Sequence, residues 1–525
     1  MKLSIERLPD IPIDCERIFF HSFRSRHTKE LVARWFGSND LILNQRIKNI
    51  NNLFDRLRVP RTPFLVSVLS WVLEQRPNAN VINKASAIEV LLEGLLEKFK
   101  ESKSRKEVDS NIQQDFLTEF AFHLDSIYLE RISRIDFDQF AVTYIKERGL
   151  NIPIDGLSVE LLRKGLLHSS DSSISFKFDC FRAYFLSRKF ADNTELLNKA
   201  LTPALISRYS TELDLFTGLN RNRIDILRSA KSMCEQSFKL LDFKFDPTAI
   251  DKITDPALFT DKLLLEKIED SLNESEVHQK KEVNELPDTV SVDHDAARKR
   301  HLAPAVSDLT RFIESLRAFS MILRNSELVA DVDLKTECFE SALDHWVMTM
   351  VAAVASVTES SNETDTSESP GESDAIKSRK KKLTPFVKAM IPQMIISIMC
   401  ESLSTPKLDL FVKQRVSDER TLVRLLAVFL TFGSGEAGNE SLVAAKNLFK
   451  DYRSNGFILE MLFLRLLHAY LNTDLNPRNA KPLRDLIGDI MVELRGGGRT
   501  ESALMKSRLL NGLDKRLFVI EERNN

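Results

Sequence analysis

The chain has 525 residues, of which 43% are hydrophobic, and its formal net charge at pH 7 is −2. A net charge this close to zero argues against a nucleic-acid-binding surface that covers the whole chain. The five cysteines lack the spacing of metal ligands, which is typical of reduced thiols in a cytoplasmic protein. Because only 16 residues are glycine and 17 are proline, the composition predicts a mainly α-helical fold. The length allows roughly three to four domains.

The N-terminal segment predicts a short strand followed by a helical bundle. Residues 1–23 carry no secretory signal, because acidic side chains interrupt them, and they end in an apolar run that indicates a strand. Residues 24–100 predict a small helical domain of about four helices. In the first of these helices we expect Leu31, Trp35 and Phe36 to face inward.

The clearest helical pair lies in the stretch Val59–Phe99. Thr62 can cap a helix with its hydroxyl group, and Pro63 suits the first helical position that follows. Apolar residues then recur at helical spacing in both segments. The predicted apolar faces consist of Phe64, Val68, Leu69 and Val72 in the first helix, and of Ala87, Leu91, Leu92, Leu95 and Leu96 in the second.

The next predicted domain, residues 109–192, combines helices with a β-hairpin. Three helical patterns are followed by the polar turn Ser169–Ser173 and by the strand-like run after it. Three helices followed by a hairpin are the plan of a winged helix, although other small α+β domains share it. We therefore expect a winged-helix-like domain and keep the second interpretation open.

The remainder of the chain predicts helices separated by two polar segments. Residues 273–300 and 358–382 are charged and lack apolar periodicity, so we expect a disordered linker and a disordered insert. Tandem short helices in the last part indicate an irregular α-solenoid of the HEAT or TPR kind. The predicted helical regions are 193–272, 301–357 and 383–525, and the last of them is divided into helices near 384–403, 405–416, 418–432, 440–453, 457–472, 482–495 and 500–513.

Several short motifs resemble binding sites, but their sequence context favours a structural or solvated segment. Gly433–Gly438 matches the glycine pattern of dinucleotide sites, but the run before it predicts a helix where such a site needs a strand. Asp293, His294, Asp295 and His301 fall in the predicted linker, where no metal ligand would be held in place. The basic run Lys377–Lys382 follows an acidic segment and predicts a solvated face. We therefore expect no catalytic residues, no metal site and no cofactor.

The stretch around Phe176–Phe185, together with Pro63, carries a resemblance to STAND NTPases of the NACHT type. In that family the winged helix ends in F-x-H-x-x-F-x-E-Y-F, and Phe176, Phe181, Tyr184 and Phe185 match it. The family histidine, which senses a nucleotide phosphate, falls on Phe178, and the family glutamate falls on Ala183. Phenylalanine cannot donate a hydrogen bond to phosphate, so this sensor position is degenerate here.

The same resemblance covers roughly residues 17–235, and bacterial STAND proteins with upstream effector domains match most closely. Their sequences share the Pro-Arg-Thr-Pro run that ends at Pro63, and a stretch like Thr217–Arg221. In the family the proline at this helix head lies against the adenine, which makes Pro63 a candidate adenine contact. The resemblance implies that residues 1–23 are the remaining edge of a nucleotide-binding core.

No phosphate-binding P-loop motif occurs in the sequence. The chain therefore resembles a STAND protein that starts just after its core, through a split gene, a truncated reading frame or a stand-alone subunit. We expect little or no ATP or ADP binding by the isolated chain. Any ATPase activity would need an upstream core or a core on another chain.

The resemblance implies a regulatory and sensor role in signalling, in bacteria a defence against phage. We expect a trigger protein to bind the C-terminal helices, and we expect neither a membrane nor nucleic acid as a partner. Two other functions stay open: a helical scaffold or adaptor that never meets a nucleotide, and a DNA-binding winged helix that uses Arg163 and Lys164.

Overall fold

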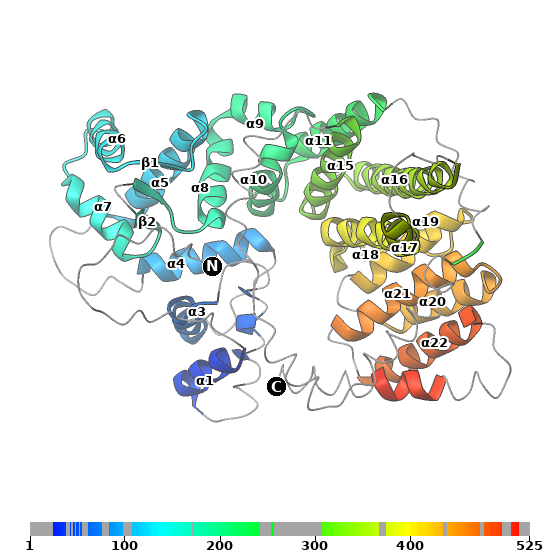
Figure 1. The fold of residues 1–525 in the computed structure, drawn as a ribbon. Coiled ribbons are helices and arrows are strands. Elements are labelled where there is room, and N and C mark those ends of the chain that lie inside the picture. The colour runs from blue at the N-terminus through cyan, green and yellow to red at the C-terminus, as the bar shows by residue number, and fades with distance from the viewer. Residues whose placement is uncertain are drawn as a thin grey trace. The chain divides into compact units, whose positions relative to one another are not determined.

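A computed structural model describes most of the chain, and it falls into two compact units (Figure 1). The described residues of the first unit run to Asn220 and those of the second begin at Arg221. The predicted strand in 1–23 and the predicted linker 273–300 lie outside the described residues. The described residues are 25–37, several positions between 43 and 54, 61–75, 83–97, 108–170, 173–241, 254–256, 307–366, 374–433, 438–472, 477–495 and 506–513.

The first unit opens with a helical bundle in which three helices have defined bounds: α1 (Ser25–Phe36), α3 (Pro63–Gln75) and α4 (Lys84–Glu97). The predicted cap is present, because the Leu65 amide donates to Thr62 Oγ1 at 3.2 Å and the helix begins at Pro63. All five residues of the predicted face of α4 are buried, as are Val68, Leu69 and Val72 of α3. Phe64 is half-buried at the head of α3.

The inward face predicted for α1 is only partly covered in the described structure. Leu31, Trp35 and Phe36 are each only half-buried, whereas Val32 is fully buried. Trp35 lies at the edge of the contact with α3, where its indole N–H donates to Glu74 at 3.1 Å. Phe36 is partly covered by the Arg46 guanidinium, which lies 5.5 Å from the centre of its ring.

The next part of the first unit is a small α+β domain with one three-stranded antiparallel sheet of order β1-β3-β2. In this sheet Ile132 pairs with Ile174, and Leu167 pairs with Phe176. The predicted hairpin is present as β2 and β3, whereas β1 is an additional strand that the sequence analysis missed. The elements in order are α5 (Ser110–Ser126), β1 (Arg131–Ser133), α6 (Arg134–Glu147), α7 (Ile154–Arg163), β2 (Leu167–Ser170), β3 (Ser173–Phe176) and α8 (Asp179–Asp192).

An aromatic core holds this domain together. Phe120 of α5 stacks on Phe176 of β3 with ring centroids 5.5 Å apart, and Phe176 in turn stacks on Phe185 of α8 at 6.0 Å. Phe137 of α6 meets the Phe120 ring edge-on at 5.1 Å. Such ring pairs stabilise a core beyond the area they bury. The motif residues Phe176 and Phe185 are therefore packing residues.

A buried ammonium group joins three helices of the first unit. Lys164, which follows α7, is 3% exposed and pairs with Glu160 at 3.0 Å. Its Nζ also donates to the Leu96 carbonyl of α4 at 3.2 Å and to Gln113 Oε1 of α5 at 3.1 Å. Gln113 in turn donates to the carbonyl of Val108. Because all of these groups are desolvated, the ends of α4, α5 and α7 are held together.

The first unit closes with α9 (Thr194–Ala200) and α10 (Ile206–Leu219), and α10 packs on α4 and α8. Asn83, the cap of α4, donates from Nδ2 to the Gly218 carbonyl at 2.8 Å. A Cβ atom at Gly218 would lie 3.1 Å from that of Ala85, so a larger residue would crowd α4. The stretch that begins at Thr217 therefore fixes α10 against the start of α4.

All the secondary-structure elements described in the second unit are helical. Its early helices pack in sequence, with α11 against α15, and both α15 and α16 against α17. The described elements are α11 (Ile224–Lys239), α15 (Asp308–Arg324), α16 (Val332–Thr366), α17 (Asp374–Leu403), the 3-10 turn η3 (Pro406–Leu408), α18 (Asp409–Arg415), α19 (Thr421–Gly433), α20 (Asn439–Asp451), α21 (Gly456–Asn472) and α22 (Pro477–Arg495).

The disordered insert predicted at 358–382 is helical on both sides of residues 367–373, which lie outside the described residues. Helix α16 continues to Thr366, and α17 begins at Asp374 and includes the basic run Lys377–Lys382. A helix that packing has already nucleated extends at little cost through residues such as Glu and Lys.

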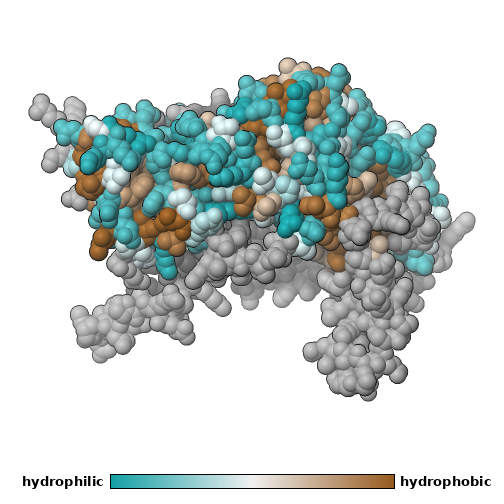
Figure 2. Space-filling model, turned by 90° about the horizontal axis from the view of Figure 1, so that it is seen from above, coloured by the Kyte–Doolittle hydropathy of each residue, from teal (hydrophilic) through white to brown (hydrophobic). Residues whose placement is uncertain are grey.

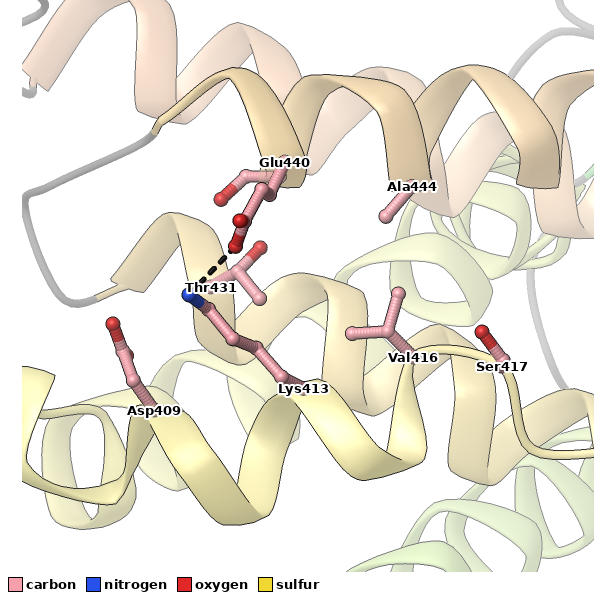
Figure 3. Close-up of a pocket in the computed structure, with 8 residues that line it drawn as sticks. Asp409, Lys413, Val416, Ser417, Thr431, Glu440 and Ala444 are labelled. Atoms are coloured by element: carbon pink, nitrogen blue, oxygen red, sulfur yellow. Dashed lines mark ion pairs between the residues drawn. The ribbon is translucent and has the colours of Figure 1, made fainter.

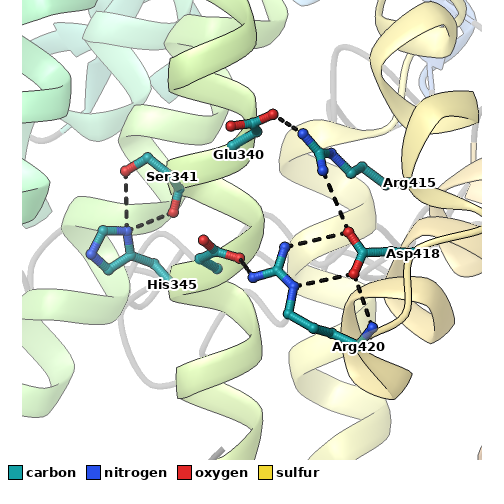
Figure 4. A network of polar contacts seen from close by, with 7 residues as sticks. Glu340, Ser341, His345, Arg415, Asp418 and Arg420 are labelled. Carbon is teal, nitrogen blue, oxygen red and sulfur yellow. Dashed lines mark hydrogen bonds and ion pairs between the residues drawn. The ribbon is translucent and has the colours of Figure 1, made fainter.

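Ion pairs and aromatic contacts connect α16 to its neighbours in the second unit. Figure 4 shows the ion pairs. Arg415 pairs with Glu340, and Arg420 bridges Asp344 at 2.9 Å and Asp418 at 3.1 Å. On another side of the same helix, the His345 ring lies against Phe238 and Phe312, with centroids 5.0 and 5.8 Å away. Burial lowers the pKa of His345 from its ordinary value.

The last helices surround α21, which the sequence predicts to be interior. Eleven of its positions are buried, among them Phe463, Leu466 and Tyr470, and α17, α19, α20 and α22 all pack against it.

Among the described residues no helix combines the length and apolar character needed to cross a bilayer.

We expect Leu92→Ala to destabilise the first unit strongly. Leu92 is 4% exposed, and large-to-small changes at buried sites cost about 2–5 kcal/mol. The matched control is Ile135→Ala, because Ile135 is 77% exposed and its loss should change stability by less than about 0.5 kcal/mol. Calorimetric melting of the full chain provides the comparison. Equal melting temperatures for the two variants would contradict the placement of this core.

We expect Lys164→Met to cost about 3–5 kcal/mol, because it leaves the buried Glu160 carboxylate without its partner. Adding Glu160→Gln should recover most of this loss, since the double variant buries no charge at this position. Urea unfolding of the wild type and both variants measures the difference. A single variant as stable as the wild type would show that the ion pair does not hold the three helices.

We expect the second unit to lose stability as the pH falls below about 6.5, the ordinary pKa of histidine. The pKa of His345 is lowered by burial, so in this range the unfolded chain binds a proton that the folded chain does not. The loss should end once the pH passes below the lowered pKa. Burial also lowers the pKa of His468, so His345→Gln should reduce the pH dependence without abolishing it. Melting curves between pH 7.5 and 5 test this, and an unchanged slope in the variant would refute it.

Candidate functional site

Pro63 and Phe178, the two residues singled out by the sequence, belong to segments that meet in the first unit. Pro63 is exposed at the first position of α3, and Phe64 follows it. Phe178 occupies the cap position of α8 with extended backbone. Lys177 connects the two segments, because its Nζ lies 5.3 Å from the centre of the Phe64 ring and 6.0 Å from that of Phe178.

The head of α3 and the connection between β3 and α8 meet at what we call the junction. The turn between α7 and β2 also contacts it. Gly165 has φ +70°, a conformation that favours glycine. A Cβ atom there would lie 3.4 Å from both Lys177 Nζ and the Phe64 ring. The Lys177 amide also donates to the Leu166 carbonyl at 3.0 Å. Backbone and side chain of Lys177 are thus both placed by this turn, which directly follows the buried Lys164.

The Phe178 side chain carries no polar group and is almost completely shielded from solvent. Its side chain is 8% exposed and its ring meets Phe181 edge-on at 5.3 Å. Its backbone carbonyl starts α8, since it accepts from the amide of Phe181 at 3.0 Å. Phe178 is therefore a packing residue in the position that the resemblance assigns to a phosphate sensor.

Lys177 is a candidate site residue that the sequence analysis missed. It is exposed, and it lies between two buried neighbours, Phe176 and Phe178. This alternation places its ammonium on the outer side of the chain, toward the head of α3. The period-2 pattern of Phe176, Lys177 and Phe178 was the available signal.

Cys180, near the start of α8, adds no negative charge to the junction. Burial raises the pKa of its thiol to about 12, an effect that Lys84 only partly offsets. The thiol therefore stays protonated at neutral pH. The cation–aromatic group of Lys177, Phe64 and Phe178 can attract an anion, and the exposed Pro63 offers an apolar surface beside it.

The other motifs from the sequence do not contribute to this site. Gly433 ends the helix α19 and Gly438 caps α20, so the glycine pattern follows a helix. Asp293, His294, Asp295 and His301 lie outside the described residues. Within the part of the chain that the structure describes, no group of three or more His, Cys, Asp or Glu side chains is arranged to hold a metal ion.

Three large apolar side chains are exposed on α6 and α7, among polar neighbours. Ile135 and Val142 of α6 are 77% and 45% exposed, and Val159 of α7 is 57% exposed. Figure 2 shows apolar residues gathered at its left end, where Figure 1 places these two helices. Of the two basic residues predicted for a DNA-reading helix, Arg163 is exposed, but Lys164 is buried and paired with Glu160.

Comparison with known proteins points to the same region as the geometry. No curated protein matches the chain. The sequence model of the family Novel STAND NTPase 4 matches residues 130–186, which run from just before β1 into α8 and include Gly165, Lys177 and Phe178. This part of the chain is therefore similar to a region of STAND-type NTPases.

Proposed function

We propose that the chain is the regulatory and sensor part of a STAND-type signalling protein. The observation that carries this proposal is the coincidence of two features. The segment similar to STAND NTPases includes the junction of β3 and α8, and the head of α3 with its exposed Pro63 meets the chain at that junction. In this proposal the junction faces a nucleotide held by a core on another chain or upstream.

The order of elements supports a winged-helix assignment for residues 109–192. Helix, strand, two helices and two antiparallel strands follow one another from α5 to β3. In this proposal the domain and the bundle before it act as one clamp, because the buried Lys164 joins α4, α5 and α7. The helices of the second unit then act as an irregular solenoid that recognises a trigger protein.

The proposed nucleotide contacts divide between two residues. Pro63 offers an apolar face to the adenine, and Lys177 offers the positive charge that the Phe178 side chain cannot supply. Any hydrolysis of ATP would belong to the core. In bacteria such a protein would act in defence against phage.

The DNA-reading alternative is weaker than the regulatory one. Phosphate contacts need exposed Lys or Arg side chains on the recognition helix. Arg163 is the one exposed basic residue of α7, because Lys164 is buried, so α7 does not provide such a surface. A plain helical scaffold remains the competing function, and the nucleotide content of the native complex separates the two.

We expect the tagged full-length chain, purified from its native cells, to retain a P-loop protein and about one adenine nucleotide per complex. Pro63→Glu should reduce the retained nucleotide, because it places a carboxylate where the adenine would lie. The fold should tolerate this change, since Pro63 is exposed and acidic residues suit the first turn of a helix. Acid extraction and chromatography measure the nucleotide.

The matched control is Gln75→Glu, an exposed position at the other end of α3, which should leave the nucleotide content unchanged. Lys177→Glu should act in the same direction as Pro63→Glu. Purified complexes without adenine nucleotide and without a P-loop protein would favour the scaffold function.

A further inference from the structure

A small pocket lies in the second unit between α18 and α20, both of which pack on α19 (Figure 3). Its volume is about 210 Å³. Pockets that bind drug-sized molecules are generally larger, with about 300–1,000 Å³. The size therefore suits a single side chain of a protein partner.

The α20 side of the pocket combines apolar surface with one hydroxyl group. Ser441 and Ala444 of α20 line it and are each only 7% exposed, and Val416 lines the opposite side. Among the described contacts the Ser441 hydroxyl has no hydrogen-bond partner. The hydroxyl oxygen is accessible from the pocket, so it can form a hydrogen bond with a polar group that binds there.

The rim of the pocket is charged and can open. Lys413 of α18 pairs with Glu440 of α20 at 2.6 Å, and their side chains are 55% and 76% exposed (Figure 3). Exposed ion pairs of this kind contribute little stability, so a partner can displace the contact. Together with Asp409, the lining carries two carboxylates and one ammonium, which favours a positively charged partner.

Two large apolar side chains flank this rim. Leu410 is 64% exposed and lies three residues before Lys413 on α18. Val443 is 56% exposed and lies three residues after Glu440 on α20. Residues three apart are neighbours on a helix surface, so both lie next to the charged rim. An apolar border around an anchor pocket is typical of protein-binding sites.

We propose that this pocket is a peptide-docking site that takes one aliphatic side chain of a protein partner, with a Lys or Arg next to it in the partner contacting the acidic rim. The Ser441 hydroxyl donates to a main-chain carbonyl of the partner beside the anchor residue. As the site of trigger recognition the pocket rests on the proposed function, but its binding of peptides needs no nucleotide.

The test selects ligands from a phage-displayed library of random 12-residue peptides on the immobilised full-length chain. We expect the selected sequences to share an aliphatic residue adjacent to Lys or Arg. Fluorescence anisotropy with a labelled synthetic copy of the consensus peptide then gives Kd. Ala444→Phe, which fills the pocket, should weaken binding about tenfold or more. Leu410→Glu provides a second variant whose exposed position leaves folding unaffected.

A charge reversal tests the rim. Glu440→Lys leaves one carboxylate and two ammonium groups at the pocket, so selection on this variant should enrich acidic residues beside the anchor in place of basic ones. The matched control is Glu419→Lys, an equal charge change at an exposed position outside the pocket, which should preserve the original consensus.

Three results would overturn the proposal: selected peptides without a shared motif, equal Kd for the wild type and both Ala444→Phe and Leu410→Glu, or a dimer in solution that Ala444→Phe dissociates. The last result would assign the pocket to a second copy of the chain. Failure here leaves the nucleotide experiment with Pro63→Glu unaffected, so the two proposals fail separately.

Discussion

The geometry of the first unit depends on the burial of the Lys164 ammonium. An ammonium with 3% exposure needs partners for all its donors, and it finds them on α4, α5 and on Glu160 of its own helix. Separation of any of these helices would leave a charge buried without compensation. Gly165 follows directly, and its turn places Lys177 beside Phe64. One desolvated charge therefore fixes both the contact between bundle and sheet and the position of the candidate site.

Much of the fold follows from local sequence signals. The cap at Thr62 and the start at Pro63 were predicted because their chemistry is local. The face of α4 was predicted because that helix is covered along its whole apolar stripe. The strand β1 was missed because three residues are too few to show alternation. The faces of α1 and the lengths of α16 and α17 depend on tertiary contacts, which composition and periodicity do not contain.

The candidate site was predictable only in part. Resemblance pointed to Pro63 and Phe178, and the structure brings their segments together. The aromatic residues that carry the resemblance are buried in packing, so they indicate a fold more than a chemistry. The alternation of Phe176, Lys177 and Phe178 indicates that Lys177 faces outward, but only the structure shows that its ammonium lies near the Phe64 and Phe178 rings. The pocket at Ser441 could not be predicted, because it is formed by helices whose spacing no sequence pattern specifies.

The hydrogen bond from Asn83 to the Gly218 carbonyl has a mechanical consequence. It lies two residues before Asn220, where the described part of the first unit ends. Tension applied to the chain at that point would first load the last turn of α10. Because the Gly218 carbonyl in this turn accepts a hydrogen bond from Asn83 at the start of α4, the load would be shared between α10 and α4. A pull at Asn220 would therefore have to break the hydrogen bond between the Asn83 side-chain amide and the Gly218 carbonyl before α10 could separate from the start of α4.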